Sequence, residues 1–143
     1  MPLLVAVGLA VQVLVPLQLA AQRDARPDDF LGLTTCEAGV PVTTLRGDVR
    51  DSLLVAEVEA HEAVHRQQAD AHGSCDAFLA TLTSASRIID AELPAYCAQW
   101  KVLVARGGDS SATRREFAWR IAAQSGAMEN RLQIAQRFEE ECR

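Results

Sequence analysis

The chain has 143 residues and a formal net charge of -5 at pH 7, which fits one small acidic domain and argues against a second one. No basic patch or run of Lys and Arg stands out in the sequence. The composition therefore argues against a nucleic-acid partner.

The N-terminal segment, residues 1–21, is almost entirely apolar and is interrupted only by Gln12 and Gln18. A charged, proline-containing stretch follows, which suits a boundary between membrane and water better than a buried core helix. The length of the segment lies between that of a signal-peptide core and that of a membrane span. We therefore expect export, with residues 1–21 either a cleaved signal peptide or a retained membrane anchor, residues 22–35 a linker and residues 36–143 the folded domain.

Four cysteines follow the apolar segment, and an even number in a small exported domain favours disulfide bonds over free thiols. Three pairings are compatible with the sequence. We expect Cys36 to pair with Cys75 and Cys97 with Cys142. A cysteine-bound zinc site is the competing interpretation, but the sequence contains no C-x-x-C pair.

The first predicted elements are a short β segment and a long helix. Residues 40–45 are β-prone and turn-forming residues surround them, which predicts one short strand or hairpin arm. A helix is expected over residues 51–72, with Asp48, Asp51 or Ser52 as its N-cap and Gly73 as its stop signal.

Three further helices are predicted, over residues 75–82, residues 84–106 and a last stretch that continues to Cys142. Pro94 indicates either that the second of these begins near Glu92 or that it is kinked at the proline. Thr113 and Glu116 form a capping box that predicts the start of the last helix. Gly126 is the position at which that helix could be interrupted. The expected fold class is mainly α, with at most a short β element before the helix of residues 51–72.

The most specific motif is HExxH, formed by His61, Glu62, Ala63, Val64 and His65. On a helix the two histidines share one face, one turn apart, so both imidazoles can bind one metal ion. Glu62 between them can reach a water molecule that the metal polarises. Leu54, Val58, His61 and His65 form one apolar-spaced stripe, which is expected to face the core.

A third metal ligand is expected downstream, because a catalytic zinc site uses three protein ligands and an open position. Glu92 is the best candidate, since it shares a helical stripe with Ile88, Ala95, Gln99 and Leu103 and a core-facing carboxylate needs a partner. Asp90 is the next choice. His72 is one residue out of register with the third histidine of a metzincin motif, and we expect it to be solvated near the helix end, where positive charge suits the helix dipole.

These residues resemble the gluzincin branch of the zinc metallopeptidases over about residues 50–105. The resemblance rests on the HExxH motif, with Gln68 following as in HExxHxxQ members, and more weakly on Glu92-Leu93-Pro94-Ala95 as a downstream ExxA segment. It implies a small zincin-like helical core in which zinc is held by His61, His65 and Glu92, with the third ligand on a helix that crosses the active-site helix.

One position departs from the family pattern. Many gluzincins carry an acidic residue three or four positions after the ligand glutamate, where this chain has Ala95 and Tyr96. Tyr96 is expected to donate a hydrogen bond to a developing oxyanion or to accept one from a ligand imidazole. The alternative is a tyrosine at the margin of the core with its hydroxyl in water.

The resemblance implies zinc-dependent hydrolysis of peptide bonds, in which Glu62 deprotonates the zinc-bound water and protonates the leaving amine. The substrate would be a peptide or protein. Residues 40–50 are a candidate edge for pairing with an extended substrate, or a plain loop. Two alternatives remain open: a non-catalytic, exported, disulfide-stapled helical binding protein, and an inactive relative whose zinc is structural.

Overall fold

The structure, a computed structural model, describes residues 31–47 and residues 51–143. The predicted export segment, residues 1–21, lies outside the described residues, as does most of the predicted linker. Within the described ranges, no helix combines the length and the apolar character needed to cross a membrane.

The chain begins its described course with a two-stranded antiparallel hairpin, β1 (Gly32–Glu37) and β2 (Val40–Leu45), whose register runs from Gly32↔Leu45 to Glu37↔Val40. The turn residues Ala38 and Gly39 both have positive φ, of 51° and 80°, which matches the tight turns that connect twisted strands. Residues 40–45 are therefore a hairpin arm with the expected bounds, whereas the partner strand β1 was not predicted and begins inside the stretch assigned to a linker.

The long helix α2 (Ser52–Ala71) follows, and its boundaries agree with the prediction. The side chain of Asp51 caps it by accepting hydrogen bonds from the backbone N–H groups of Leu53 and Leu54. Its C-cap is His72, and Gly73 follows with a φ of 82°. The short helix α3 (Cys75–Leu79) stops earlier than expected, because the next residues form turns that bond back by three positions.

The helix α4 (Ala85–Ala105) is capped by Ser84 and runs through Pro94 without ending. A start near Glu92 is therefore excluded. Pro94 cannot donate to the carbonyl of Asp90, and it is accommodated because it lies on the exposed face of α4.

The C-terminal region is interrupted at Gly126, the position at which the sequence allowed a break. It consists of α5 (Ser110–Ser125), the 3-10 turn η2 (Met128–Asn130) and α6 (Arg131–Glu141). The capping box expected at Thr113 is wrong: Asp109 caps α5 earlier in the chain, and Glu116 instead pairs with Arg120. Gly126 ends α5 in the left-handed conformation, with φ of 70°.

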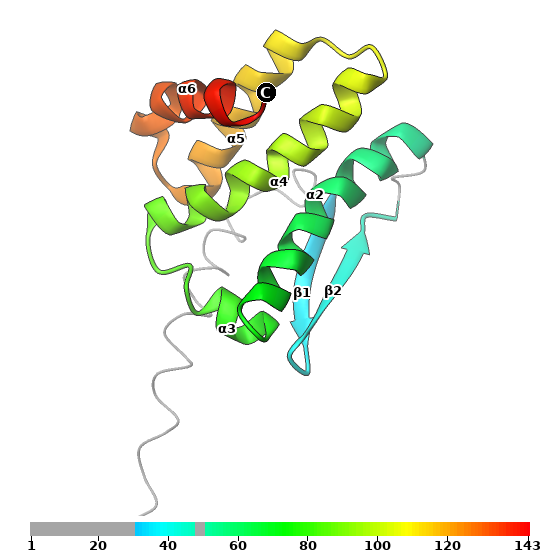
Figure 1. The fold of residues 1–143 in the computed structure, drawn as a ribbon, viewed down its shortest axis with the longest axis vertical. Helices are drawn as coiled ribbons and strands as arrows, with labels where there is room; N and C mark the ends of the chain where they lie inside the picture. The colour runs from blue at the N-terminus through cyan, green and yellow to red at the C-terminus, as the bar shows by residue number, and fades with distance from the viewer. Residues whose placement is uncertain (1–30, 48–50) are drawn as a thin grey trace, which may run out of the picture.

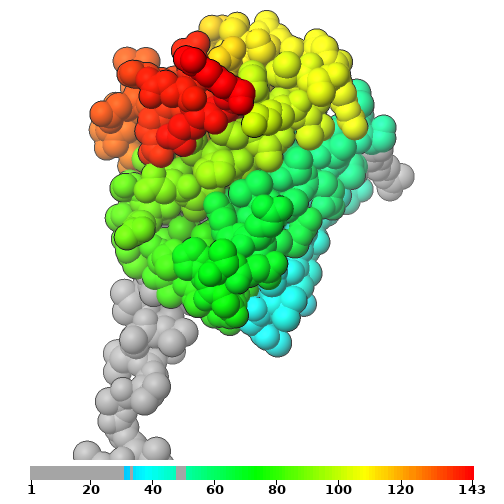
Figure 2. Space-filling model, in the orientation of Figure 1, coloured from blue at the N-terminus to red at the C-terminus, as the bar shows by residue number. Residues whose placement is uncertain are grey.

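The elements form successive layers, in which α2 lies between the hairpin and α4, and α5 and α6 pack against the other side of α4 (Figure 1). The space-filling view has the same order, with the hairpin beside α2 at one end and α5 and α6 at the other (Figure 2). The fold class is mainly α, as predicted. The larger core cluster joins α4, α5 and α6, with fully buried side chains such as Leu93, Ile121, Ile134 and Phe138.

Both expected disulfide bonds are present. Cys36–Cys75 ties β1 to the start of α3, with 5.6 Å between the Cα atoms. Cys97–Cys142 ties α4 to the end of α6, with 5.2 Å between the Cα atoms. Cys36–Cys75 therefore links two elements that contact α2, and Cys97–Cys142 links α4 to α6 at the other end of the layered fold.

Candidate metal centre

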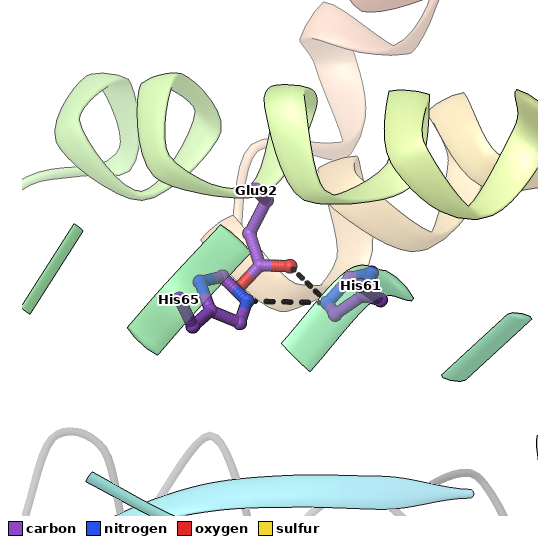
Figure 3. Close-up of side chains that lie close together, drawn as sticks. All are labelled: His61, His65 and Glu92. Carbon is purple, nitrogen blue, oxygen red and sulfur yellow. Dashed lines mark hydrogen bonds and ion pairs between the residues drawn. The ribbon is translucent and has the colours of Figure 1, made fainter. Parts of the chain in front are cut away.

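Three side chains predicted as metal ligands meet between α2 and α4. His61 and His65 lie one turn apart on the face of α2 that packs against α4. Glu92 extends from α4 toward both imidazoles (Figure 3). The structure thus brings together residues separated by up to 31 positions, because α4 packs along α2 over this region.

The three side chains lie close enough together to bind one metal ion. Nε2 of His61 and Nε2 of His65 are 3.1 Å apart, His61 Nε2 is 3.5 Å from Oε2 of Glu92, and His65 Nε2 is 3.5 Å from Oε1 of the same carboxylate. One ligand atom from each residue lies within 4.8 Å of the other two. Zinc binds nitrogen and oxygen ligands at about 2.0–2.1 Å, which places neighbouring ligands of a tetrahedron about 3.3 Å apart. The donor set of two imidazoles and one carboxylate is also one that zinc accepts in catalytic sites.

The centre is largely shielded from solvent, and two of its polar atoms have no hydrogen-bond partner. His61 is 8% exposed, and its Nδ1 is buried without a partner. Glu92 Oε2 is also buried without a hydrogen bond and faces His61 only at ion-pair distance. A cation between the three side chains would satisfy this carboxylate oxygen, which agrees with the tendency of buried charges to be paired or to bind metals.

Without a metal, the site binds a proton strongly. Burial alone lowers the pKa of His65, but the hydrogen bond and charge of Glu92, assisted by Gln68 and Glu62, outweigh it and raise that pKa to about 9. Burial raises the pKa of Glu92, but the two histidines outweigh it and hold that pKa well below its ordinary value. The anionic carboxylate therefore attracts a cation, either a proton on His65 or a metal ion.

Gln68 orients one of the candidate ligands, His65. Its Oε1 is 2.9 Å from Nδ1 of His65, and its Nε2 donates a hydrogen bond of 2.9 Å to the backbone carbonyl of Ala91 on α4. With Nδ1–H donating to Gln68, the lone pair of His65 Nε2 points into the centre. Gln68 thus fixes both the ring of His65 and the distance between the two helices beside Glu92.

Glu62 faces a different neighbour from the two histidines. It is buried, with 5% of its surface exposed, and its Oε2 accepts a hydrogen bond from the Thr34 hydroxyl of β1. The charge of Glu62 also contributes to the raised pKa of His65. The role of Glu62 as a base stays a prediction.

Tyr96 borders the centre through its ring. It packs edge-on against His61, with 4.5 Å between the ring centroids, and against Phe117 at 4.9 Å. Burial, together with the charge of Glu92, raises the pKa of its hydroxyl, and the Gln124 side chain lies beside that hydroxyl. Tyr96 is buried, with 6% of its surface exposed, so its ring belongs to the core. A hydrogen bond to an oxyanion remains a prediction.

Two further candidates lie outside the centre. Asp90, the second choice of third ligand, is exposed and pairs with Arg137 at 3.0 Å. His72 is exposed at the end of α2, and its Nδ1 is 2.7 Å from the carbonyl oxygen of Gln68. The assignment of His72 to a solvated helix end is therefore confirmed.

The sequence did not reveal two supporting residues. Gln68 was visible as part of HExxHxxQ, but its bridging role depends on where α4 lies. Thr34 carried no signal, because it is 28 positions from Glu62 and lies in a stretch assigned to a linker. Comparison of the chain with protein-family models, curated proteins and solved structures finds no significant match.

Proposed function

We propose that this protein is an exported zinc-dependent hydrolase of peptide bonds with a gluzincin-like site. His61, His65 and Glu92 hold the metal, and Glu62 is the general base. The proposal depends on one observation above all: His61, His65 and Glu92 each offer a ligand atom, and these three atoms lie within 4.8 Å of one another.

The number of ligands supports catalysis over a purely structural role. In the described part of the chain, the group that can hold a metal contains three residues, His61, His65 and Glu92. Structural zinc sites are usually closed by four protein ligands, whereas catalytic sites use three and leave a position for water or substrate. Glu62, the neighbour of His61 on α2, would be the acceptor that such a site requires.

The residues divide the work of hydrolysis between them. Bound zinc supplies Lewis acidity, lowering the pKa of a water molecule and polarising the substrate carbonyl. Glu62 takes a proton from the attacking water as the water oxygen bonds to the carbonyl carbon. It then delivers that proton to the leaving amine as the C–N bond breaks. Gln68 holds His65 in the tautomer that binds the metal. The ring of Tyr96 limits the movement of the His61 ring.

Export is supported by the two disulfide bonds, which persist in oxidising compartments. The apolar segment of residues 1–21 would direct the chain across a membrane or tether it there. The substrate we propose is accordingly a peptide or protein outside the cytosol.

The first experiment measures zinc content by elemental analysis in the oxidised full chain and in its Glu92→Gln variant. One zinc per chain is expected in the parent, with at least a tenfold weaker zinc affinity in the variant, because one of three ligands is lost. Asp90→Asn is the matched control. It also removes a carboxylate from α4, but the Asp90 side chain pairs with Arg137 and lies outside the centre. A folded parent that binds no zinc would refute the proposal.

The second experiment tests the base. Glu62→Gln should retain zinc and lower the hydrolysis of a randomised, quenched fluorescent peptide mixture by at least about 100-fold. Asp70→Asn, which removes an exposed carboxylate from the same helix, should leave hydrolysis unchanged. Equal rates in the parent and in Glu62→Gln would rule out the mechanism. Zinc binding without hydrolysis by the parent would favour a structural metal site.

A further inference from the structure

A chain of hydrogen bonds connects Glu62 to a guanidinium group through the hairpin. The Thr34 hydroxyl of β1 donates to Glu62 Oε2. The hydroxyl oxygens of Thr34 and Thr43 are 3.0 Å apart across the two strands. Arg66, one turn after Glu62 on α2, donates from Nη1 to the Thr43 oxygen at 2.6 Å. The chain therefore leaves α2, crosses both strands and returns to α2.

The donors in this chain have one consistent direction. A guanidinium group only donates, so Thr43 accepts from Arg66, and an ionised carboxylate only accepts, so Thr34 donates to Glu62. Each hydroxyl has a single proton, and that of Thr34 is already committed. Thr43 must then donate to Thr34. Every proton points toward Glu62, and hydrogen bonds aligned in this way polarise one another.

The hairpin is pressed against α2 at the place where this chain forms. A Cβ atom at Gly32 would lie 2.4 Å from Cγ1 of Val58 and 3.6 Å from Cγ of Glu62, so glycine is what allows β1 to approach so closely. The other end of β1 is fixed covalently by the Cys36–Cys75 disulfide. Both ends of β1 are thus held, with Thr34 between them.

We propose that Thr34, supported by Thr43 and Arg66, is a positioning residue that holds Glu62 as a base and keeps it from becoming a metal ligand. This inference rests on the proposed function. The two histidines of the motif face Glu92 of α4, and a Glu62 carboxylate free to rotate toward them would bind the metal and close its open position. Thr34 binds Oε2 from the hairpin side, and Oε1 remains to accept the proton from water.

The test compares Thr34→Val, Thr34→Ser and the control Thr83→Val in the zinc-loaded full chain. Thr83 is exposed in the connection between α3 and α4, outside the hairpin and the centre. With the randomised fluorescent peptide mixture, Thr34→Val should lower kcat by about 10–100-fold and change KM by less than about threefold, because a hydrogen bond to a charged group is lost. Thr34→Ser should recover most of the rate, and Thr83→Val should match the parent.

Zinc affinity separates positioning from a general structural role. Thr34→Val should bind zinc at least as tightly as the parent, since Glu62 is then free to approach the metal. A loss of zinc affinity parallel to the loss of rate, or no recovery by serine, would overturn the proposal. If Glu62→Gln abolishes hydrolysis but Thr34→Val does not slow it, the proposed function stands and the positioning role fails.

A second readout needs neither zinc nor substrate. In the metal-free full chain, the Thr34 hydroxyl proton should exchange slowly enough with water to give its own NMR resonance. That resonance should vanish in Glu62→Ala and persist in Asp70→Asn. Fast exchange in the parent, or an unchanged resonance in Glu62→Ala, would refute the hydrogen-bond chain even if the enzyme proves to be a peptidase.

Discussion

Raising the pH should destabilise this protein when no metal is bound. Without a metal, His65 and Glu92 form a buried ion pair, and that pair depends on the proton of His65. The pKa of His65 in the folded chain is raised to about 9 from its ordinary 6.5. A group whose pKa is higher in the folded state stabilises the fold fully below its unfolded pKa, and this contribution disappears as the pH rises through the folded value. The relevant window is therefore about pH 6.5 to 9.

The size of the effect follows from the difference between the two pKa values. Each pKa unit corresponds to about 1.4 kcal/mol, so the shift of His65 represents about 3 kcal/mol of unfolding free energy. The lowered pKa of Glu92 describes the same attraction, and its share of the stability is lost only in acid, as the pH falls below the ordinary glutamate range. Above pH 6, the change is governed by His65.

The assay is urea unfolding of the full chain in a chelator, followed by circular dichroism at pH 6.0 and pH 9.5. We expect the unfolding free energy to fall by about 3 kcal/mol between these values. Glu92→Gln should remove most of the pH dependence, whereas Asp90→Asn should keep it. The upper limit of pH 9.5 keeps Tyr96 neutral, since burial raises its pKa. An unfolding free energy that is the same at both pH values would refute the ion pair.

Three further predictions test other parts of the site and fold. Gln68→Ala should weaken zinc binding about 10–100-fold in a chelator competition, because His65 loses its orienting partner; unchanged affinity would contradict that role. Gly32→Ala should lower the unfolding free energy by about 1–3 kcal/mol in urea, since its Cβ collides with α2; equal stability would show that β1 can move away. Replacing Cys97 and Cys142 together by alanine should cost about 2–4 kcal/mol in the same assay, and a smaller loss would indicate that packing alone holds α6.

The parts of the fold that sequence could predict are those that local chemistry decides. Asp51 and Gly73 mark the ends of α2 through a side-chain cap and a left-handed glycine. The helical repeat then places His61 and His65 on one face. Glu92 was found because a carboxylate on a core-facing stripe needs a partner, and that requirement does not depend on knowing the tertiary fold.

The remaining features depend on competition or on distant contacts. Asp109 and Thr113 both offer caps for α5, and the earlier one is used. β1 was missed because its turn contains Ala38, which adopts the left-handed conformation without being one of the residues that usually signal it. The role of Thr34 was missed for the same reason, because its contact with Glu62 forms only when the hairpin packs against α2.

Under the proposed function, the orientation of the HExxH helix would place metal affinity and proton transfer under separate control. His61 and His65 point to α4, whereas Glu62 points to the hairpin, and each neighbour is fastened by its own disulfide bond. Substitutions along α4 should alter how tightly the ion is held, and substitutions along the hairpin should alter how fast it is used. A variant series built on this chain could therefore tune the two properties one at a time.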